Sequence, residues 1–137
     1  MNEFTVREAA ALLGVSDDTV RRWADTGRLQ LRKNAAGRQT IAGTALLPLL
    51  TELAAGSPLA ETFPAAKASA RNRFTGIITA VTRDGVMAQV DLQAGPFRVV
   101  SLMSREAADE LGLEPGMLAS ASVKATVVTI ELPESSS

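Results

Sequence analysis

The sequence predicts an α+β protein in two parts, a helical N-terminal unit that includes a β-hairpin and a small antiparallel β-barrel after it. In the first third, apolar residues recur at helical spacing between capping residues. A stretch rich in Ala and Pro follows. Beyond it, apolar and polar residues alternate between turn signals, as in half-buried strands. We therefore divide the chain into a unit over residues 1–55, a linker over 56–68 and a second unit over 69–132.

The composition limits the classes of function that the chain can have. With 137 residues and a formal net charge of −1, each part lies near the lower size limit for independent stability, so we expect a homo-oligomer. The sequence has no Cys and no His, which excludes thiolate, disulfide, imidazole and common zinc chemistry. No pair of carboxylates is placed convincingly for acid–base catalysis. We therefore expect a binding protein with no metal ion, and not an enzyme.

The N-terminus is polar and charged, which is not the pattern of a signal peptide. No apolar run approaches the ~20 residues that are needed to span a bilayer. We expect a cytoplasmic protein without a membrane partner.

Two short helices are predicted at the start of the chain. Thr5 and Glu8 have the spacing of a capping box, which begins the first helix, and Gly14 ends it. Ser16 is placed to cap the second helix, which ends near Gly27. Two helices joined by so tight a turn are typical of a helix-turn-helix. The apolar faces comprise Val6, Ala9, Ala10 and Leu13 in the first helix and Val20 and Trp23 in the second.

A basic hairpin is predicted next. Alternation over 29–32 and 38–41 indicates two strands around a turn at 33–37, which would form a wing beside the helices. Between residues 21 and 38 the basic residues face one acid, Asp25. On an otherwise neutral chain this is the charge pattern that a phosphate backbone attracts. The basic residues are Arg21, Arg22, Arg28, Arg32, Lys33 and Arg38.

These segments resemble the winged helix-turn-helix of MerR-type and excisionase-type DNA-binding domains. The matching segments are Phe4–Ala10, Leu13–Ser16, Thr19–Trp23, Gly27–Leu29 and Gly37–Arg38. The resemblance implies double-stranded DNA as a partner, with the second helix in the major groove and the wing on the flanking backbone. The residues expected at DNA are Ser16, Asp18, Thr19, Arg21, Arg22, Lys33 and Arg38.

A short apolar helix over 45–54 is predicted to end this unit, with Pro48 tolerable only in its first turn. MerR-type regulators usually continue into a long dimerising helix, so the resemblance implies that dimerisation comes from elsewhere in this chain. The linker over 56–68 contains Pro58 and Pro64, which make it semi-rigid.

The second unit is predicted to be a small OB-like antiparallel barrel. Its first strand covers 74–82, with Gly76 as a candidate bulge, and the Asp-Gly pair after it signals a hairpin. Further strands are expected over 86–92 and 97–103. Ser104 is placed to cap a short helix over 105–111. A long strand over 119–132, bent near 124–126, completes the predicted barrel.

This unit is similar to the Mop domain, of TOBE type, of the molbindins and the molybdate-dependent regulators. The matching segments are Ser69–Asn72, Phe74–Ile78, Asp109–Leu113, Pro115–Gly116 and Lys124–Val128. The resemblance implies molybdate or tungstate as the ligand, held between subunits of a homo-oligomer. The oligomer is expected to be at least a dimer, and the sequence leaves open whether it is a dimer or a hexamer made of three dimers. The resemblance implies that one subunit supplies the first and last segments and the other the start of the short helix. The residues implied at the anion are Ser69, Ala70, Arg71, Asn72, Ser104, Lys124, Ala125 and Thr126.

The chemistry of these residues fits a tetrahedral dianion. Molybdate accepts hydrogen bonds and donates none, so its site needs hydroxyls, backbone N–H groups and cations. Such a site disfavours protonated phosphate, whose O–H would lack an acceptor. In this sequence Thr126 replaces the Ser of the family, and Ala107 replaces a second one.

Three functions are compatible with these observations. The leading hypothesis is a DNA-binding transcriptional regulator that responds to molybdate or tungstate. The second is a molybdate-binding or storage protein that binds DNA only weakly. The third is a DNA-binding protein whose barrel only oligomerises, with the anion site lost at Ala107.

Overall fold

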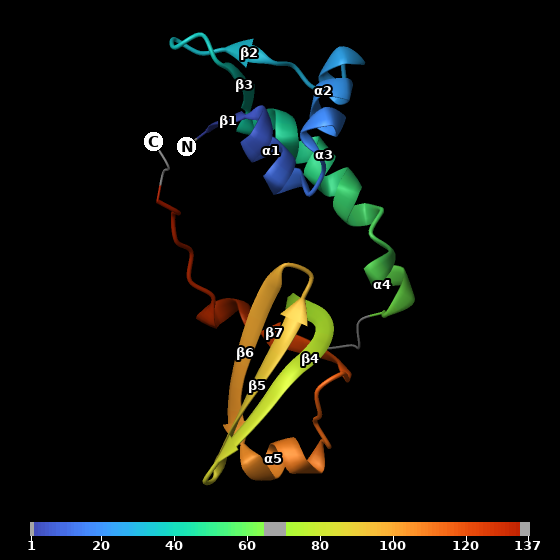
Figure 1. Ribbon diagram of the computed structural model, residues 1–137, viewed down its shortest axis with the longest axis vertical. Coiled ribbons are helices and arrows are strands. Elements are labelled where there is room, and N and C mark those ends of the chain that lie inside the picture. Colours follow the sequence, from blue (N-terminus) through green and yellow to red (C-terminus); the bar gives the residue numbers. More distant parts are fainter. Residues whose placement is uncertain (1, 65–70, 135–137) are drawn as a thin grey trace. The chain divides into compact units, whose positions relative to one another are not determined.

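The computed structural model describes residues 2–64 and 71–134, which form two compact units (Figure 1). The first is built from the residues up to Pro58 and the second from Leu59 to Leu132. The predicted α+β class is confirmed. The elements are β1 (Glu3–Thr5), α1 (Val6–Leu13), α2 (Asp17–Asp25), β2 (Arg32–Lys33), β3 (Gln39–Ala42), α3 (Gly43–Ala55), α4 (Pro58–Thr62), β4 (Asn72–Asp84), β5 (Met87–Ala94), β6 (Phe97–Ser104), α5 (Arg105–Glu110), β7 (Leu118–Val123) and the 3₁₀ turn η1 (Ala125–Val127).

The helix-turn-helix forms as its capping residues predict. The Glu8 backbone N–H donates to Thr5 Oγ1 at 3.2 Å, and the Thr5 N–H donates to Glu8 Oε1 at 2.9 Å, which closes the capping box. Gly14 ends α1 with φ +72°, a conformation that favours glycine. The predicted apolar face of α1 is buried, and Val20 of α2 packs into the same core.

A third strand, which sequence analysis did not predict, ties the N-terminus to the wing. β1 pairs antiparallel with β3, so the small sheet has the order β1-β3-β2. The strand expected over 29–32 is wrong in extent, because β2 covers only Arg32–Lys33. Leu29, which is 5% exposed, is instead part of the helical core. Leu29 therefore packs into the core and does not pair with β3 as part of a strand.

Helix α3 is longer than predicted. It begins at Gly43, whose N–H donates to the carbonyl of Asn2 at 2.7 Å, so its start is tied to the residue just before β1. Pro48 therefore lies beyond the first turn, contrary to the prediction. A proline there leaves the carbonyl of Thr44 without its helical donor. Thr44 is exposed, so water can supply that hydrogen bond.

The predicted linker contains a short helix. α4 spans Pro58–Thr62, between the segments that interrupt helical structure. Residues 65–70 lie outside the described residues, and with them the C-terminal end of the linker.

The second unit is a four-stranded antiparallel sheet with the order β6-β5-β4-β7. The alternation predicted for β5 is confirmed, because Ala88, Val90, Leu92 and Ala94 are buried. The hairpin predicted at Gly85, with φ +61°, joins β4 to β5. On the partly buried carboxylate of Asp91, hydrogen bonds from the side chains of Gln89 and then Arg98 lower the pKa.

The sheet is a half-barrel, and the long closing strand predicted over 119–132 is wrong. β7 ends at Val123 and is followed by η1, and the described residues after η1 belong to no strand. In a single copy β6 and β7 are edge strands, so each has one partner. In the described structure the segment beyond η1 pairs with neither of these edges, and it is exposed, with Ile130 at 89% and Leu132 at 92%.

The bulge predicted at Gly76 lies elsewhere. The register of β4 against β5 shifts between Ile78 and Ala80. Gly76 is instead a point of close backbone approach. A Cβ at this residue would collide with the carbonyl group of Gln93, and it would lie 2.9 Å from the Cα atom of Ala94. Only glycine fits without a movement of β5.

We predict that Gly76→Ala lowers the free energy of unfolding of the second unit by about 2 kcal/mol, because β5 must shift. Urea denaturation followed by far-UV circular dichroism measures the loss. Trp23, the single tryptophan, reports the first unit by its fluorescence, and that transition should not move. The matched control is Gly56→Ala at the end of α3, where the added Cβ would lie 3.5 Å from its nearest neighbour. Equal stability of Gly76→Ala and the parent would contradict the prediction.

Candidate functional site

Helix α2, which is predicted to enter the major groove, has its N-terminus closed by its own side chains. Ser16 Oγ accepts the Thr19 backbone N–H at 3.1 Å and lies 2.9 Å from the Thr19 hydroxyl. Both residues, predicted to contact DNA, therefore also hold the helix start. Asp18, Arg21 and Arg22 are exposed on α2. They are the α2 candidates free of capping hydrogen bonds in the described structure.

The wing is shaped by a residue that sequence analysis missed. Asn34 Oδ1 accepts the backbone N–H groups of Ala36 at 2.9 Å and of Arg38 at 3.0 Å. Gly37 completes this turn with φ +79°. An Asn followed three residues later by Gly was the available signal. The turn sets Lys33 and Arg38, both exposed, on its two sides.

One arginine of the basic stretch, Arg28, makes contacts that stabilise the fold of the first unit. The Arg28 guanidinium lies 4.7 Å from the centre of the Trp23 ring, and its Nη2 donates to Glu52 Oε2 of α3 at 2.8 Å. This pair of contacts joins the end of α2 to α3. Arg28 therefore helps to fix the orientation of α2 relative to α3.

The other arginines and the lysine of the basic stretch form no ion pair within the part of the chain that the structure describes. In the described structure, no ion pair forms at the predicted DNA residues Arg21, Arg22, Lys33 and Arg38, nor at Arg7. Arg7 was not among the predicted DNA residues, because it lies outside the basic stretch, in the first turn of α1. Exposed, unpaired cations on α1, α2 and the wing are available to an anionic partner.

In the second unit, the structure brings two predicted anion segments together. Asn72 and Val123 are register partners of β4 and β7, and Asn72 Nδ2 donates to the Val123 carbonyl at 3.0 Å. Arg71 and Lys124, the adjacent residues, therefore lie at one end of this strand pair. Asn72 uses a donor for that carbonyl, so part of its role is to hold the two segments in register.

The last segment forms η1. Lys124 precedes the turn, and its carbonyl accepts the Val127 N–H at 3.0 Å. Ala125 and Thr126 lie in the turn and are exposed, as are Arg71 and Lys124. No ion pair forms at either cation in the described residues. Ser69 and Ala70, also predicted at the anion, lie outside the described residues.

Ser104 is not brought to this group within one copy. It caps α5, where its Oγ accepts the Ala107 N–H at 3.1 Å. α5 lies beside the β4–β5 hairpin, because the Arg105 N–H donates to the Val86 carbonyl at 2.8 Å. Asn72 begins β4 and the hairpin follows its other end (Figure 1). An extended strand of 13 residues is about 40 Å long. Within one copy, Ser104 and the group around Arg71 and Lys124 therefore lie at opposite ends of β4.

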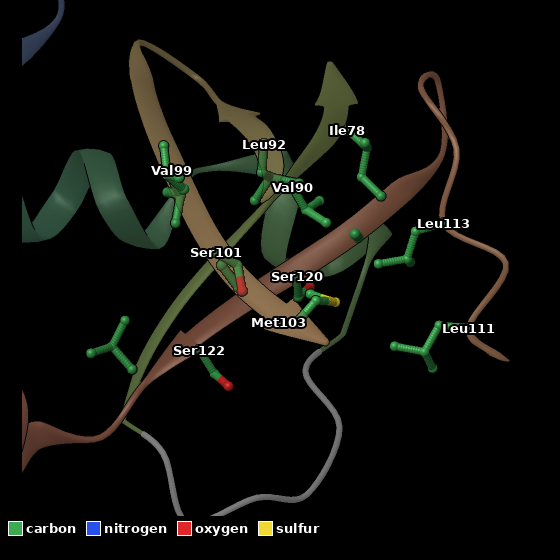
Figure 2. Close-up of a pocket in the computed structure, with 14 residues that line it drawn as sticks. Ile78, Val90, Leu92, Val99, Ser101, Met103, Leu111, Leu113, Ser120 and Ser122 are labelled. Atoms are coloured by element: carbon green, nitrogen blue, oxygen red, sulfur yellow. The ribbon is translucent and has the colours of Figure 1, made fainter. Parts of the chain in front are cut away.

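A hollow of about 410 Å³ opens between β6 and β7 (Figure 2). Its lining is mainly apolar, with Val90, Leu92 and Met103 among the contributors. Three serines are among its lining residues, Ser101, Ser120 and Ser122, and no lysine or arginine of the described residues lines it. A hollow of this composition suits apolar side chains and not a dianion. The hollow lies where the half-barrel is open, between its two edge strands.

None of the helices in the described residues has the length and apolar character needed to cross a membrane. Family models match two separate stretches of the chain. A helix-turn-helix domain matches residues 3–41, and a TOBE domain matches residues 68–130. No curated protein matches the chain.

Three solved structures are similar to the second unit. MopII from Clostridium pasteurianum is 34% identical over 48% of this chain and 100% of its own, with a TM-score of 0.46. A molybdate-binding protein from Sporomusa ovata is 25% identical over 49% of this chain and 100% of its own, with a TM-score of 0.47. The cytoplasmic molybdate-binding protein ModG is 39% identical over 44% of this chain and 43% of its own, with a TM-score of 0.42.

The two domain matches follow the order of the two structural units, and the first of these relatives matches over its whole length. The chain therefore belongs, in its C-terminal half, to the TOBE family of the Mop type, and it carries a helix-turn-helix domain in front of that domain.

Proposed function

We propose that the protein is a cytoplasmic DNA-binding transcriptional regulator that responds to molybdate or tungstate. One observation carries this proposal: a helix-turn-helix with unpaired cations precedes a TOBE domain in which Arg71 and Lys124 meet at one end of a strand pair. Both units offer donors and positive charge to anions. The proposed regulation needs no covalent chemistry. Binding of the anion at the second unit can change the affinity of the first unit for DNA.

The anion site is proposed at the segments of Arg71 and Lys124. Two unpaired cations, the hydroxyl of Thr126 and the backbone N–H groups around η1 form a set in which donors outnumber acceptors. A fully ionised tetrahedral dianion satisfies such a set. Molybdate-binding proteins among the similar structures support this choice of ligand. Ser69 and Ala70 are proposed to complete the site.

We propose that the site is shared between two copies. Ser104 lies at the opposite end of β4 from Arg71 and Lys124 within one copy. It can join them only from a second copy. Its hydroxyl accepts the Ala107 N–H, so its own O–H stays available to donate to an anion.

The open half-barrel offers a route to such an oligomer. Val128, Ile130 and Leu132 recur at every second residue after η1, which is the period of a strand, and all three are exposed. We propose that this segment of one copy enters the hollow between β6 and β7 of another. A side chain of this kind contributes about 1.5–3 kcal/mol when it is fully buried. The exchange would also give the edge strands a partner.

Oligomerisation would present the helix-turn-helix units in pairs. Paired units read two DNA half-sites at a spacing that the protein sets. An anion held at the interface between copies can alter that spacing. Molybdate would then change the affinity for DNA, and DNA would change the affinity for molybdate by the same factor.

We predict that molybdate changes the affinity for the operator by about 5–150-fold, the usual range of coupling between two sites. The operator is first selected from random duplexes, and its dissociation constant is then measured with and without molybdate. Sulfate is the control anion. Molybdate binding without any effect on DNA would favour a storage protein. DNA binding without molybdate binding would leave the barrel as an oligomerisation module. Either result would contradict the proposed regulator.

We predict that Arg71→Ala and Lys124→Ala each weaken molybdate binding about tenfold or more, because each removes a charged donor. Isothermal titration calorimetry measures the affinity. Lys33→Ala is the matched control, since it removes a lysine from the wing. It should lower the affinity for DNA and leave molybdate binding unchanged, whereas the two site variants should keep DNA binding without anion. Unchanged molybdate affinity in Arg71→Ala would refute the site assignment.

We predict that Ile130→Asp shifts the protein toward the monomer, because a carboxylate cannot enter the apolar hollow. Analytical ultracentrifugation at several protein concentrations measures the shift. Thr129→Asp is the matched control, since it adds the same charge on the other face of the segment. The control should keep the oligomer of the parent. An unchanged oligomer in Ile130→Asp would rule out the proposed exchange.

A further inference from the structure

Three arginines from three elements line one hollow of the first unit. Arg7 comes from α1, Arg21 from α2 and Arg38 from the wing. The hollow measures about 310 Å³. These residues are far apart in the sequence, so only the fold brings their charges to one place. The other lining residues are Thr5, Val6, Asp17 and Gln39.

The charge in this hollow is not balanced. Its described lining has three cations and one acid, Asp17, which leaves two positive charges in excess. No ion pair joins Asp17 to Arg7 or Arg21 in the described residues. The contrast is Arg28, which binds Glu52 and the face of an aromatic ring. Clustered guanidinium groups repel one another until an anion lies between them.

The start of α1 adds backbone donors. Val6 and Arg7 are its first two residues, and their N–H groups have no acceptor within the helix. The positive end of the helix dipole favours an anion at the same place. The Glu8 carboxylate lies nearby but is held by the Thr5 N–H in the capping box.

An adjoining hollow supplies a second observation. It shares Arg7 and Arg38 with the first and is also lined by Thr40, along with the acids Glu3 and Glu8. Thr40 is 5% exposed, and its hydroxyl is the buried side-chain atom without a hydrogen-bond partner in the described structure. Such a group normally finds a partner in protein or water. A hydrated anion between Arg7 and Arg38 would supply one.

We propose that the hollow holds a phosphate of the DNA backbone, with Arg7, Arg21 and Arg38 as its ligands. The inference rests on the proposed function, since it requires this unit to bind DNA. DNA is favoured over a free anion because α2 and the wing, the elements expected at the duplex, form its walls. Arg21 then contacts the backbone and positions the protein. Arg22, about 100° further round α2, is left for the edges of the bases.

The first test uses a duplex of random sequence and about two helical turns, since a phosphate contact carries no sequence information. Fluorescence anisotropy measures the affinity at several salt concentrations. Arg7→Gln is expected to bind roughly fivefold more weakly and to show a smaller salt slope. Arg7→Lys should recover part of the loss. The matched control is Arg105→Gln, which removes one exposed arginine from the second unit and should bind as the parent does.

A double variant tests whether the arginines share one phosphate. Side chains with a common partner have coupled energies, whereas separate contacts add. The affinity loss of Arg7→Gln/Arg38→Gln should therefore fall short of the product of the two single losses by about twofold or more. Losses that multiply would place the two side chains on separate phosphates and overturn the shared site.

The remaining outcomes separate this inference from the proposed function. If the parent binds the duplex with salt dependence and Arg7→Gln binds equally well, the phosphate site is refuted and the regulator stands. If the parent does not bind DNA at all, both fail. Inorganic phosphate without DNA is the second arm. Binding that is lost in Arg7→Gln, with duplex affinity unchanged, would assign the hollow to a free anion and overturn the DNA contact.

Discussion

The unpaired edges of the four-stranded sheet are the constraint on which the second unit depends. β6 and β7 have one partner each, and an apolar hollow lies between them. Backbone donors and apolar surface left open in this way favour the addition of another strand. The exposed, alternating residues after η1 have the right period for that strand. A unit of this size buries a small share of its surface, so the proposed second copy would add to its stability.

The same geometry explains how an anion could join the copies. Asn72 holds the Arg71 and Lys124 segments at one end of β4, and Ser104 caps α5 beyond the other end. Two copies are needed to bring these donors together. Anion binding and assembly would then be linked, because a ligand that binds only the assembled state stabilises it by mass action.

In the first unit, the ion pair between Arg28 and Glu52 distinguishes an arginine with a structural role from the other arginines of the basic stretch. Arg28 joins the end of α2 to α3 through Trp23 and Glu52, so it contributes to the position of α2. Arg7 of α1, Arg21 of α2 and Arg38 of the wing form no ion pair within the described residues. The basic stretch alone does not show which arginine forms an ion pair, because Arg28 and Arg21 have the same side chain. The pairing depends on which acid the fold places within reach.

Much of the local structure of this protein could be predicted from short-range patterns in its sequence. Caps such as Thr5 and Ser16, the turn at Gly85 and the alternation in β5 depend on neighbours a few residues away, so their patterns could be predicted. The tertiary structure alone decided which residues meet. It paired β1 with β3, ended β7 at Val123, placed Gly76 against β5 and brought Arg7 to Arg21 and Arg38. Those outcomes depend on long-range packing and on the number of strands available in one copy, which no local pattern encodes.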